Sequence, residues 1–255
     1  YYYSQRYGSA DSFIEDYQSS HEGQYVLFLS RRTTDSLVKE FVDCTISRTK
    51  QGDSTISLKM MNYLWKNYLH KIDIPNVLFA SQLKSSLESL IAYSESQEAF
   101  LNVTSNYLPS VRSFLQFWGE SVEVISNDIE EVEIEELLIH LRKFNSKVFG
   151  TLQTSDLLAI ITHFFPEISI EDEKYISNIS LKVWDKHQEV SDFLVVLKET
   201  SNNEDMSIDK AYERYARRKN PNQVIVGKRY FTKHITETLG DFIFDDRYIL
   251  QSWFV

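Results

Sequence analysis

"AYERYARRKNPNQVIVGKRYFTKHITETLGDFIFDDRYILQSWF", residues 211–254, contains the signals of one complete folding unit in order. Ser207 precedes the first amphipathic run, and its hydroxyl is predicted to cap that helix. The second run, 228–239, places apolar residues at helical spacing, and Gly240 directly after it predicts the helix end. Alternating apolar residues on both sides of Asp245-Asp246 then predict a β-hairpin with a tight turn.

The same order of signals occurs earlier in the chain. Segments 64–105 and 139–180 each show a helical run, a second helical run, a stop, and an alternating pair of strands. The segments start about 72–75 residues apart, which is typical of an internal repeat. Ser81 is predicted to cap the second helix of the first copy, and Thr154 or Ser155 that of the second.

Helix, turn, helix and hairpin is the order of a winged-helix unit. The sequence therefore predicts an α+β, mostly helical fold with about three tandem winged-helix-like units. The predicted division is a helical N-terminal segment over 1–50 and units over 55–119, 120–200 and 206–255.

Further helices are predicted between and before these units. Residues 108–118 and 191–199 either connect units or form the first helix of the next one. In the N-terminal part, 9–18 and 33–46 have helical patterns. Cys44 lies on the apolar part of the second of these segments, and we expect it to be a buried structural thiol.

Composition narrows the class of protein. Hydrophobic residues make up 42% of the 255 residues, which is enough for packed cores and argues against disorder. No apolar run approaches the ~18–20 residues of a membrane span, and no signal peptide opens the chain. A single cysteine excludes an internal disulfide. We therefore expect an intracellular, reducing location and no membrane contact, and the start at Tyr1 suggests a fragment of a longer protein.

No motif for catalysis is present. The sequence contains no phosphate loop, no nucleophile elbow, and no His/Cys spacing of a metal site. We predict no catalytic residue, no metal site and no cofactor, and the chain by itself is not expected to be an enzyme.

Charge is distributed unevenly. Residues 120–205 hold 7 basic and 19 acidic side chains, a formal charge of −12, whereas 206–255 hold 9 basic and 6 acidic, a charge of +3. The acidic region suits a protein partner or simple solvation. Its densest part, 127–138, is predicted to be a solvated helix start, because carboxylates there complement the helix dipole.

The basic residues of the last unit are the candidate nucleic-acid site. They are Arg214, Arg217, Arg218, Lys228, Arg229, Lys233 and His234. In a winged helix, the second helix of this unit would enter the major groove, and its cations would contact phosphates or guanines. The alternative is a helix that packs its apolar face and solvates its basic one. The sequence leaves both interpretations open.

Several phrases also resemble a known family. "YYYSQRYGSADSFI", "MMNYLWKNYLHKIDIPNVLF", "VTSNYLPSVRSFLQFW", "HFFPEISIEDEKYI" and "VGKRYFTKHI" are similar to the region after the ATPase in helicase–primase-like replication proteins of giant and other large DNA viruses. The resemblance implies a C-terminal accessory region with winged-helix folds, located in the host cytoplasm (a viral factory) or nucleus. It carries over no catalytic residue.

Two functions follow as hypotheses. In the first, the chain is a non-catalytic accessory module that engages nucleic acid through 206–255. In the second, the winged-helix repeats form a protein–protein interaction scaffold in a viral replication, transcription or translation complex, with the acidic residues 120–205 as the contact region.

Overall fold

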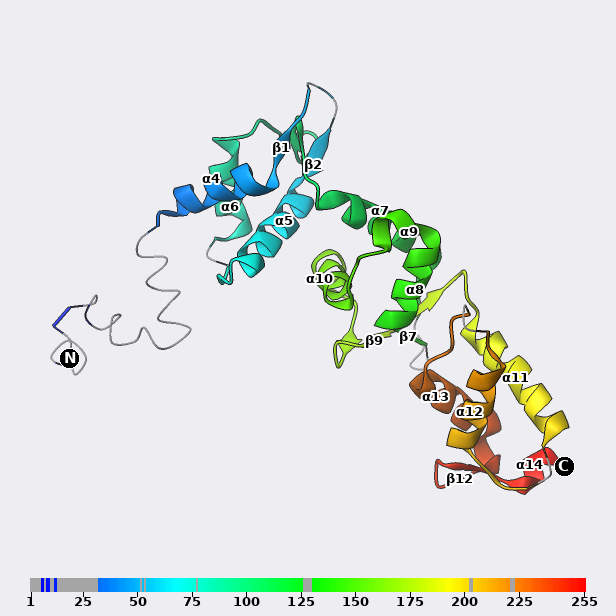
Figure 1. Cartoon of the computed structure of the whole chain (residues 1–255). Helices are drawn as coiled ribbons and strands as arrows, with labels where there is room; N and C mark the ends of the chain where they lie inside the picture. Colours follow the sequence, from blue (N-terminus) through cyan, green and yellow to red (C-terminus); the bar gives the residue numbers. More distant parts are fainter. Residues whose placement is uncertain are drawn as a thin grey trace. The chain divides into compact units, whose positions relative to one another are not determined.

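The computed structural model describes residues 6, 8, 9, 12, 32–50, 52, 54–76, 78–125, 130–201, 204–220 and 223–255. The chain forms two compact units, residues 1–109 and 110–255, and each is described by itself (Figure 1). The fold is α+β and mostly helical with small antiparallel sheets, as predicted. None of the helices in the described ranges is long and apolar enough to cross a membrane.

The first unit contains one copy of the repeat. Its elements are α4 (Thr34–Thr45), β1 (Ser47–Arg48), β2 (Thr55–Ser57), α5 (Leu58–Lys71), α6 (Ala80–Glu88), β3 (Tyr93–Ser94), β4 (Ala99–Leu101) and β5 (Val103–Thr104). Helix α4 packs against both α5 and α6. The predicted helix at 33–46 is thus present, whereas the one predicted at 9–18 lies largely outside the described residues.

The second unit contains two copies. The first consists of α7 (Leu108–Ser121), β6 (Val122–Val124), β7 (Glu131–Glu133), α8 (Ile134–Phe144), α9 (Ser146–Phe149), α10 (Thr154–Phe164), β8 (Ile170–Glu171), β9 (Tyr175–Ser177) and β10 (Ile179–Leu181). The second consists of α11 (Lys186–Thr200), β11 (Met206–Ser207), α12 (Ile208–Arg218), α13 (Lys228–Leu239), η1 (Gly240–Phe242), β12 (Ile243–Phe244), β13 (Tyr248–Ile249) and α14 (Gln251–Phe254).

The described residues of the three copies share one topology. A helix precedes a first strand, two further helices follow (α9 is an additional short turn in the middle copy), and a hairpin closes the order. Each copy has a three-stranded antiparallel sheet, in the orders β2-β4-β3, β7-β9-β8 and β11-β13-β12, and the last strand of each of these sheets lies in its middle. Strands β1 and β5, and β6 and β10, form two further two-stranded sheets. The helices at 108–121 and 186–200 are therefore the first helices of the following copies, one of the two predicted alternatives.

The hairpins of the second unit have the predicted tight turns. Asp172 and Glu173 have φ of 51° and 53°, and Asp245 and Asp246 have φ of 51° and 50°. Two consecutive positive φ values define a type I′ turn, whose twist matches that of the flanking strands. Aspartate tolerates this region better than most residues do, which explains how a turn without glycine forms.

The predicted helix ends were correct at α12 and α13. The Ser207 hydroxyl accepts a hydrogen bond from the Lys210 amide at 3.2 Å, and Gly240 ends α13 with φ of 43°. Two predicted caps were wrong. Helices α6 and α10 begin one or two residues earlier, where Gln82 and Asp156 accept from the amides of Phe79 and Gln153. A side chain three residues into the helix satisfies the free amide there, so no serine or threonine cap is needed.

Helix α11 belongs to the core of the last copy. Its apolar face, which includes Phe193 and Leu197, packs in one buried cluster with Tyr215, Phe231 and Ile235. The predicted boundary at residue 200 assigned this helix to the preceding unit. The division into 1–50, 55–119, 120–200 and 206–255 stays a prediction.

The prediction for Cys44 was wrong. Leu37, Val38, Phe41 and Thr45 form the buried stripe of α4, whereas Cys44 is exposed. Successive residues of a helix are about 100° apart, so the position before Thr45 turns away from the core.

Candidate nucleic-acid interface

The basic helix α13 contacts the acidic copy that precedes it in the chain. Its N-terminal half packs beside β7, β9 and the start of α8 through the N-cap Gly227 and the helix residues Arg229, Tyr230 and Lys233. Both copies lie in the same compact unit. The face on which the sequence predicts phosphate contacts is therefore engaged with carboxylates of the same chain.

Arg229 makes the most extensive of these contacts. Its guanidinium pairs with Glu171 through Nη2 and lies 3.2 Å from Glu131 through Nε. The same group stacks over the Tyr175 ring at 4.3 Å, a cation–π contact. The hydrogen bond to Arg229 lowers the pKa of Glu171, and the bond to Glu171 raises the pKa of Arg229. The guanidinium thus bridges the sheet and the hairpin of the preceding copy.

Lys233, one turn further along α13, also reaches the preceding copy. Its ammonium pairs with the Glu131 Oε2 that receives Arg229. The Glu131 side chain is only 2% exposed, whereas those of Arg229 and Lys233 are 30% and 34% exposed. A buried carboxylate is costly unless cations and hydrogen-bond donors surround it. Arg229 and Lys233 therefore neutralise a charge that the fold has removed from water.

Glu136 is the second buried carboxylate at this contact, and it joins three helix starts. One oxygen accepts the Gly227 amide at 2.7 Å, and the other receives Lys186 Nζ at 2.8 Å and the Glu133 amide at 2.9 Å. Burial raises the pKa of Glu136, and Lys186 opposes that effect. Lys186 also donates to the Glu131 carbonyl at 2.8 Å and lies 4.4 Å over the Tyr230 ring.

Gly227 lets the two copies approach closely. A Cβ atom at this position would lie 2.1 Å from the Glu133 carboxylate. The absence of a side chain allows the backbone of α13 to reach the end of β7, where its amide meets Glu136. The atoms that this Cβ would meet all belong to the Glu133 side chain, so Gly227 leaves room for that carboxylate.

This arrangement corrects the prediction for residues 127–138. Glu131 and Val132 belong to strand β7, and the helix begins at Ile134. Glu131 and Glu136 are buried, so this part of the run is not a solvated helix face. This segment is a strand and not a helix because Val132 pairs with Ile176 of β9 and both side chains are buried in the core.

The remaining predicted residues lie apart from this contact. Lys228 pairs with Asp209 on the exposed surface at 2.8 Å, and Arg214 donates to the Ser201 hydroxyl at 3.3 Å. Arg217 pairs with Glu213 at 3.4 Å, and its side chain is 80% exposed. An exposed pair of this kind is weak and easily broken. The Arg217 guanidinium is therefore accessible to a ligand.

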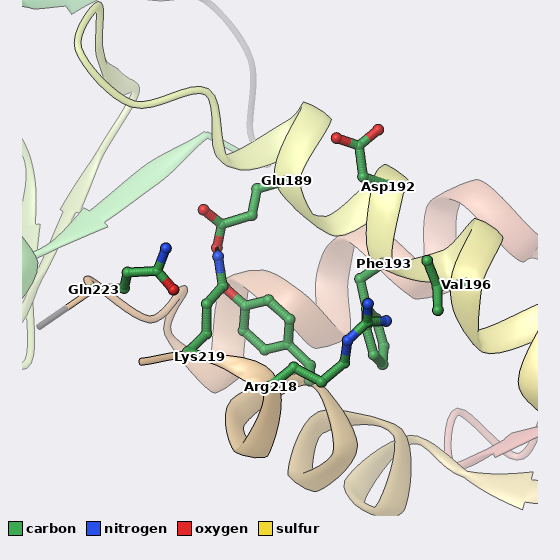
Figure 2. A pocket seen from close by; sticks show the side chains of 8 residues that line it. Glu189, Asp192, Phe193, Val196, Arg218, Lys219 and Gln223 are labelled. Atoms are coloured by element: carbon green, nitrogen blue, oxygen red, sulfur yellow. Dashed lines mark hydrogen bonds and ion pairs between the residues drawn. The ribbon is translucent and has the colours of Figure 1, made fainter. Parts of the chain in front are cut away.

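Arg218 lines a pocket between α11 and α12 (Figure 2). Its guanidinium lies 6.0 Å from the Phe193 ring centre. At the other end of the pocket, Glu189 pairs with Lys219 at 2.9 Å and accepts hydrogen bonds from Tyr215 and Trp184. Burial and the bond to Glu189 raise the pKa of Tyr215. The Glu189–Lys219 pair neutralises this end of the pocket, whereas Arg218 at the other end has no ion-pair partner among the described residues.

His234 is buried and only 3% exposed. Its Nε2 lies 3.3 Å from the hydroxyls of both Ser191 and Thr238, and its ring stacks on Tyr230. Burial, followed by the neighbouring His187, lowers the pKa of His234. It therefore adds no positive charge at neutral pH, and in this arrangement it lies in the interior of the last copy.

A second histidine makes stability depend on pH. Burial, followed by Lys143 and Lys186, lowers the pKa of His140 to about 4. The folded chain keeps this ring neutral, whereas the unfolded chain protonates it below about pH 6.5. Stability should therefore fall as pH drops from 6.5 towards 4. We expect His140→Gln to reduce that fall, measured as the free energy of unfolding in urea at pH 7 and pH 5. An unchanged fall in the variant would assign the pH dependence to other groups.

Comparison with known proteins adds no relative. No family model matches this chain, and no curated protein or solved structure matches it either.

Sequence reasoning did not identify the partners of the basic helix. Those partners in the preceding copy and at the start of α11 are Glu130, Glu131, Glu136, Glu171, Tyr175 and Lys186. The opposite charges of residues 120–205 and 206–255 were a signal that could have identified the acidic partners. Nothing in the local sequence of Lys186 indicates a buried ammonium, since its partners lie about 50 residues away.

Proposed function

We propose that the three copies are winged-helix units and that the chain is a protein-interaction scaffold in a larger assembly. Support for the winged-helix assignment comes from the shared order of helix, strand, two helices and hairpin, with the last strand central in each sheet. The resemblance to the region after the ATPase of viral helicase–primase-like proteins suggests a replication complex as that assembly.

One observation favours the scaffold over a nucleic-acid reader. The helix that would enter the major groove, α13, uses Arg229 and Lys233 to pair with buried or hairpin carboxylates of the preceding copy. A recognition helix needs its cations free for phosphates and bases. Here the same cations hold two copies within residues 110–255 against each other, so this face of α13 serves as an interaction surface.

Nucleic-acid engagement is the second candidate, and it falls on another element. Arg217 and Arg218, at the end of α12, are exposed. Among the residues that the structure covers, Arg218 has no ion-pair partner. Arg217 pairs only with Glu213, and both of these side chains are exposed. These two cations, rather than those of α13, would contact phosphate.

Binding to labelled duplex and single-stranded DNA and RNA at ~50 mM salt tests both proposals, because phosphate contacts are strongest at low salt. We expect Arg229→Gln/Lys233→Gln to leave any binding unchanged. Weaker binding by Arg217→Gln/Arg218→Gln alone would support the second candidate. Loss of binding in the α13 variant, with its circular dichroism spectrum intact, would overturn the scaffold proposal.

A further inference from the structure

The hairpins of the two copies in the second unit are equivalent in sequence and geometry. Residues 170–175 read IEDEKY and residues 243–248 read IFDDRY. In both, the pairs on either side of the turn are equivalent, Glu171 with Tyr175 and Phe244 with Tyr248, and the first two of the three residues between them have positive φ. The isoleucines face inward in both hairpins, where Ile176 and Ile249 are fully buried. The outer faces therefore consist of Glu171 and Tyr175 in one copy and Phe244 and Tyr248 in the other.

The outer face of the middle hairpin contacts a helix, although the Glu171 side chain there remains 51% exposed. Arg229 of α13 bonds to Glu171 and lies over Tyr175, and Lys233 reaches Glu131 beside the hairpin. This contact defines what such a face binds in this chain: a helix that presents an arginine and, four residues later, a lysine.

The outer face of the last hairpin is exposed. Phe244 is 63% exposed, Tyr248 45%, and the neighbouring Phe242 40%. Asp205 occupies the position equivalent to Glu131. Glu131 directly precedes Val132, which pairs with Ile176 of the central strand, and Asp205 directly precedes Met206, which pairs with Ile249. Asp245 and Asp246 at the turn add exposed negative charge. The face thus combines exposed aromatic rings with exposed carboxylates.

We infer that this face, formed by Phe242, Phe244 and Tyr248 with Asp205, binds a basic helix of a partner protein in the way that the middle hairpin binds α13. Phe244 replaces Glu171, so the partner's arginine lies between two aromatic rings instead of a ring and a carboxylate. A planar guanidinium suits that site better than an ammonium. The next cation, four residues on, faces Asp205, whose Oδ1 also accepts the Gln251 amide at the start of α14 at 2.7 Å. This inference rests on the proposed scaffold function and names the chemistry of the partner.

A peptide of residues 224–240 is a suitable probe, because it contains the one helix known to fit such a face. Phe231 and Ile235, which face the core in the folded chain, are replaced by a staple that holds the peptide helical. Fluorescence anisotropy with the full chain should show saturable binding. Phe244→Ala/Tyr248→Ala in the chain, or Arg229→Gln in the peptide, should each weaken it at least tenfold.

The two control variants remove an exposed side chain elsewhere on the last copy and the aromatic ring of the middle hairpin that is equivalent to Tyr248. Val195→Ala, at a 61% exposed position on α11, should leave peptide affinity unchanged. Tyr175→Ala reports displacement of the chain's own α13 from the middle hairpin. No binding at ~100 µM peptide, or weakening by Tyr175→Ala but not by the Phe244/Tyr248 variant, would overturn the inference. The scaffold proposal would still stand if the α13 variant kept its nucleic-acid binding unchanged, so the two failures are distinguishable.

Discussion

Replacing Glu136 by alanine is expected to destabilise residues 110–255 by about 3–5 kcal/mol, the usual cost of removing one partner from a buried ion pair. The variant leaves the Lys186 ammonium, which is 4% exposed, without its carboxylate. It also removes the acceptor of the Gly227 and Glu133 amides. Urea unfolding, monitored by fluorescence, measures the free energy directly.

Glu135→Ala is the matched control, because the neighbouring glutamate is exposed and makes none of these contacts. We expect a change of at most about 0.5 kcal/mol there. In Glu136→Ala/Lys186→Met, the loss should be smaller than in Glu136→Ala alone, since no unpaired charge remains buried. Equal stability of the Glu136 and Glu135 variants would mean that Glu136 does not join the helix starts.

Replacing both Arg229 and Lys233 by glutamine is expected to lower the free energy of unfolding by about 2–4 kcal/mol. Both side chains pair with Glu131, whose carboxylate would remain buried without a counter-charge. Glutamine keeps a polar side chain of similar length, so the lost charge is the main difference. If these residues served nucleic acid alone, their removal would leave the stability of the free chain unchanged.

Lys210→Gln/Arg217→Gln is the control for charge, because it also removes one lysine and one arginine, but from exposed positions of α12. Its expected effect is within about 0.5 kcal/mol. A further check is ionic strength. The difference between the α13 variant and the native chain should persist at ~0.5 M salt, because buried pairs are screened less than exposed ones. Equal stability of the two double variants would contradict the docking role of α13.

Local patterns were sufficient for the repeat. The apolar spacing of α8, α12 and α13, the Ser207 cap, the Gly240 stop and the Asp245-Asp246 turn are all properties of a few adjacent residues. Each depends on backbone geometry that the nearby side chains determine. The same locality explains the wrong prediction at Glu131, whose burial depends on segments distant in the sequence. The error at Cys44 was local, since the buried stripe of α4 passes through Thr45 instead.

The candidate site was predicted as a list of cations, and their positions on α12 and α13 were correct. Their partners were not. Whether Arg229 faces solvent or Glu171 depends on a contact between residues 58 positions apart. The contact between Lys233 and Glu131 joins residues 102 positions apart. No periodicity records such a pairing, because it arises only when two folded copies meet.

The sequence by itself determined the repeated unit, its fold class and the opposite charges of residues 120–205 and 206–255, since these follow from residue type and short-range spacing. Only the tertiary structure decided what the charges do. It buries Glu131 and Glu136 at the start of one copy and places Arg229, Lys233 and the Gly227 amide of the next copy against them. Burial makes these carboxylates require partners, and the close approach at Gly227 supplies them. The charge difference between the copies is thereby accounted for within the chain.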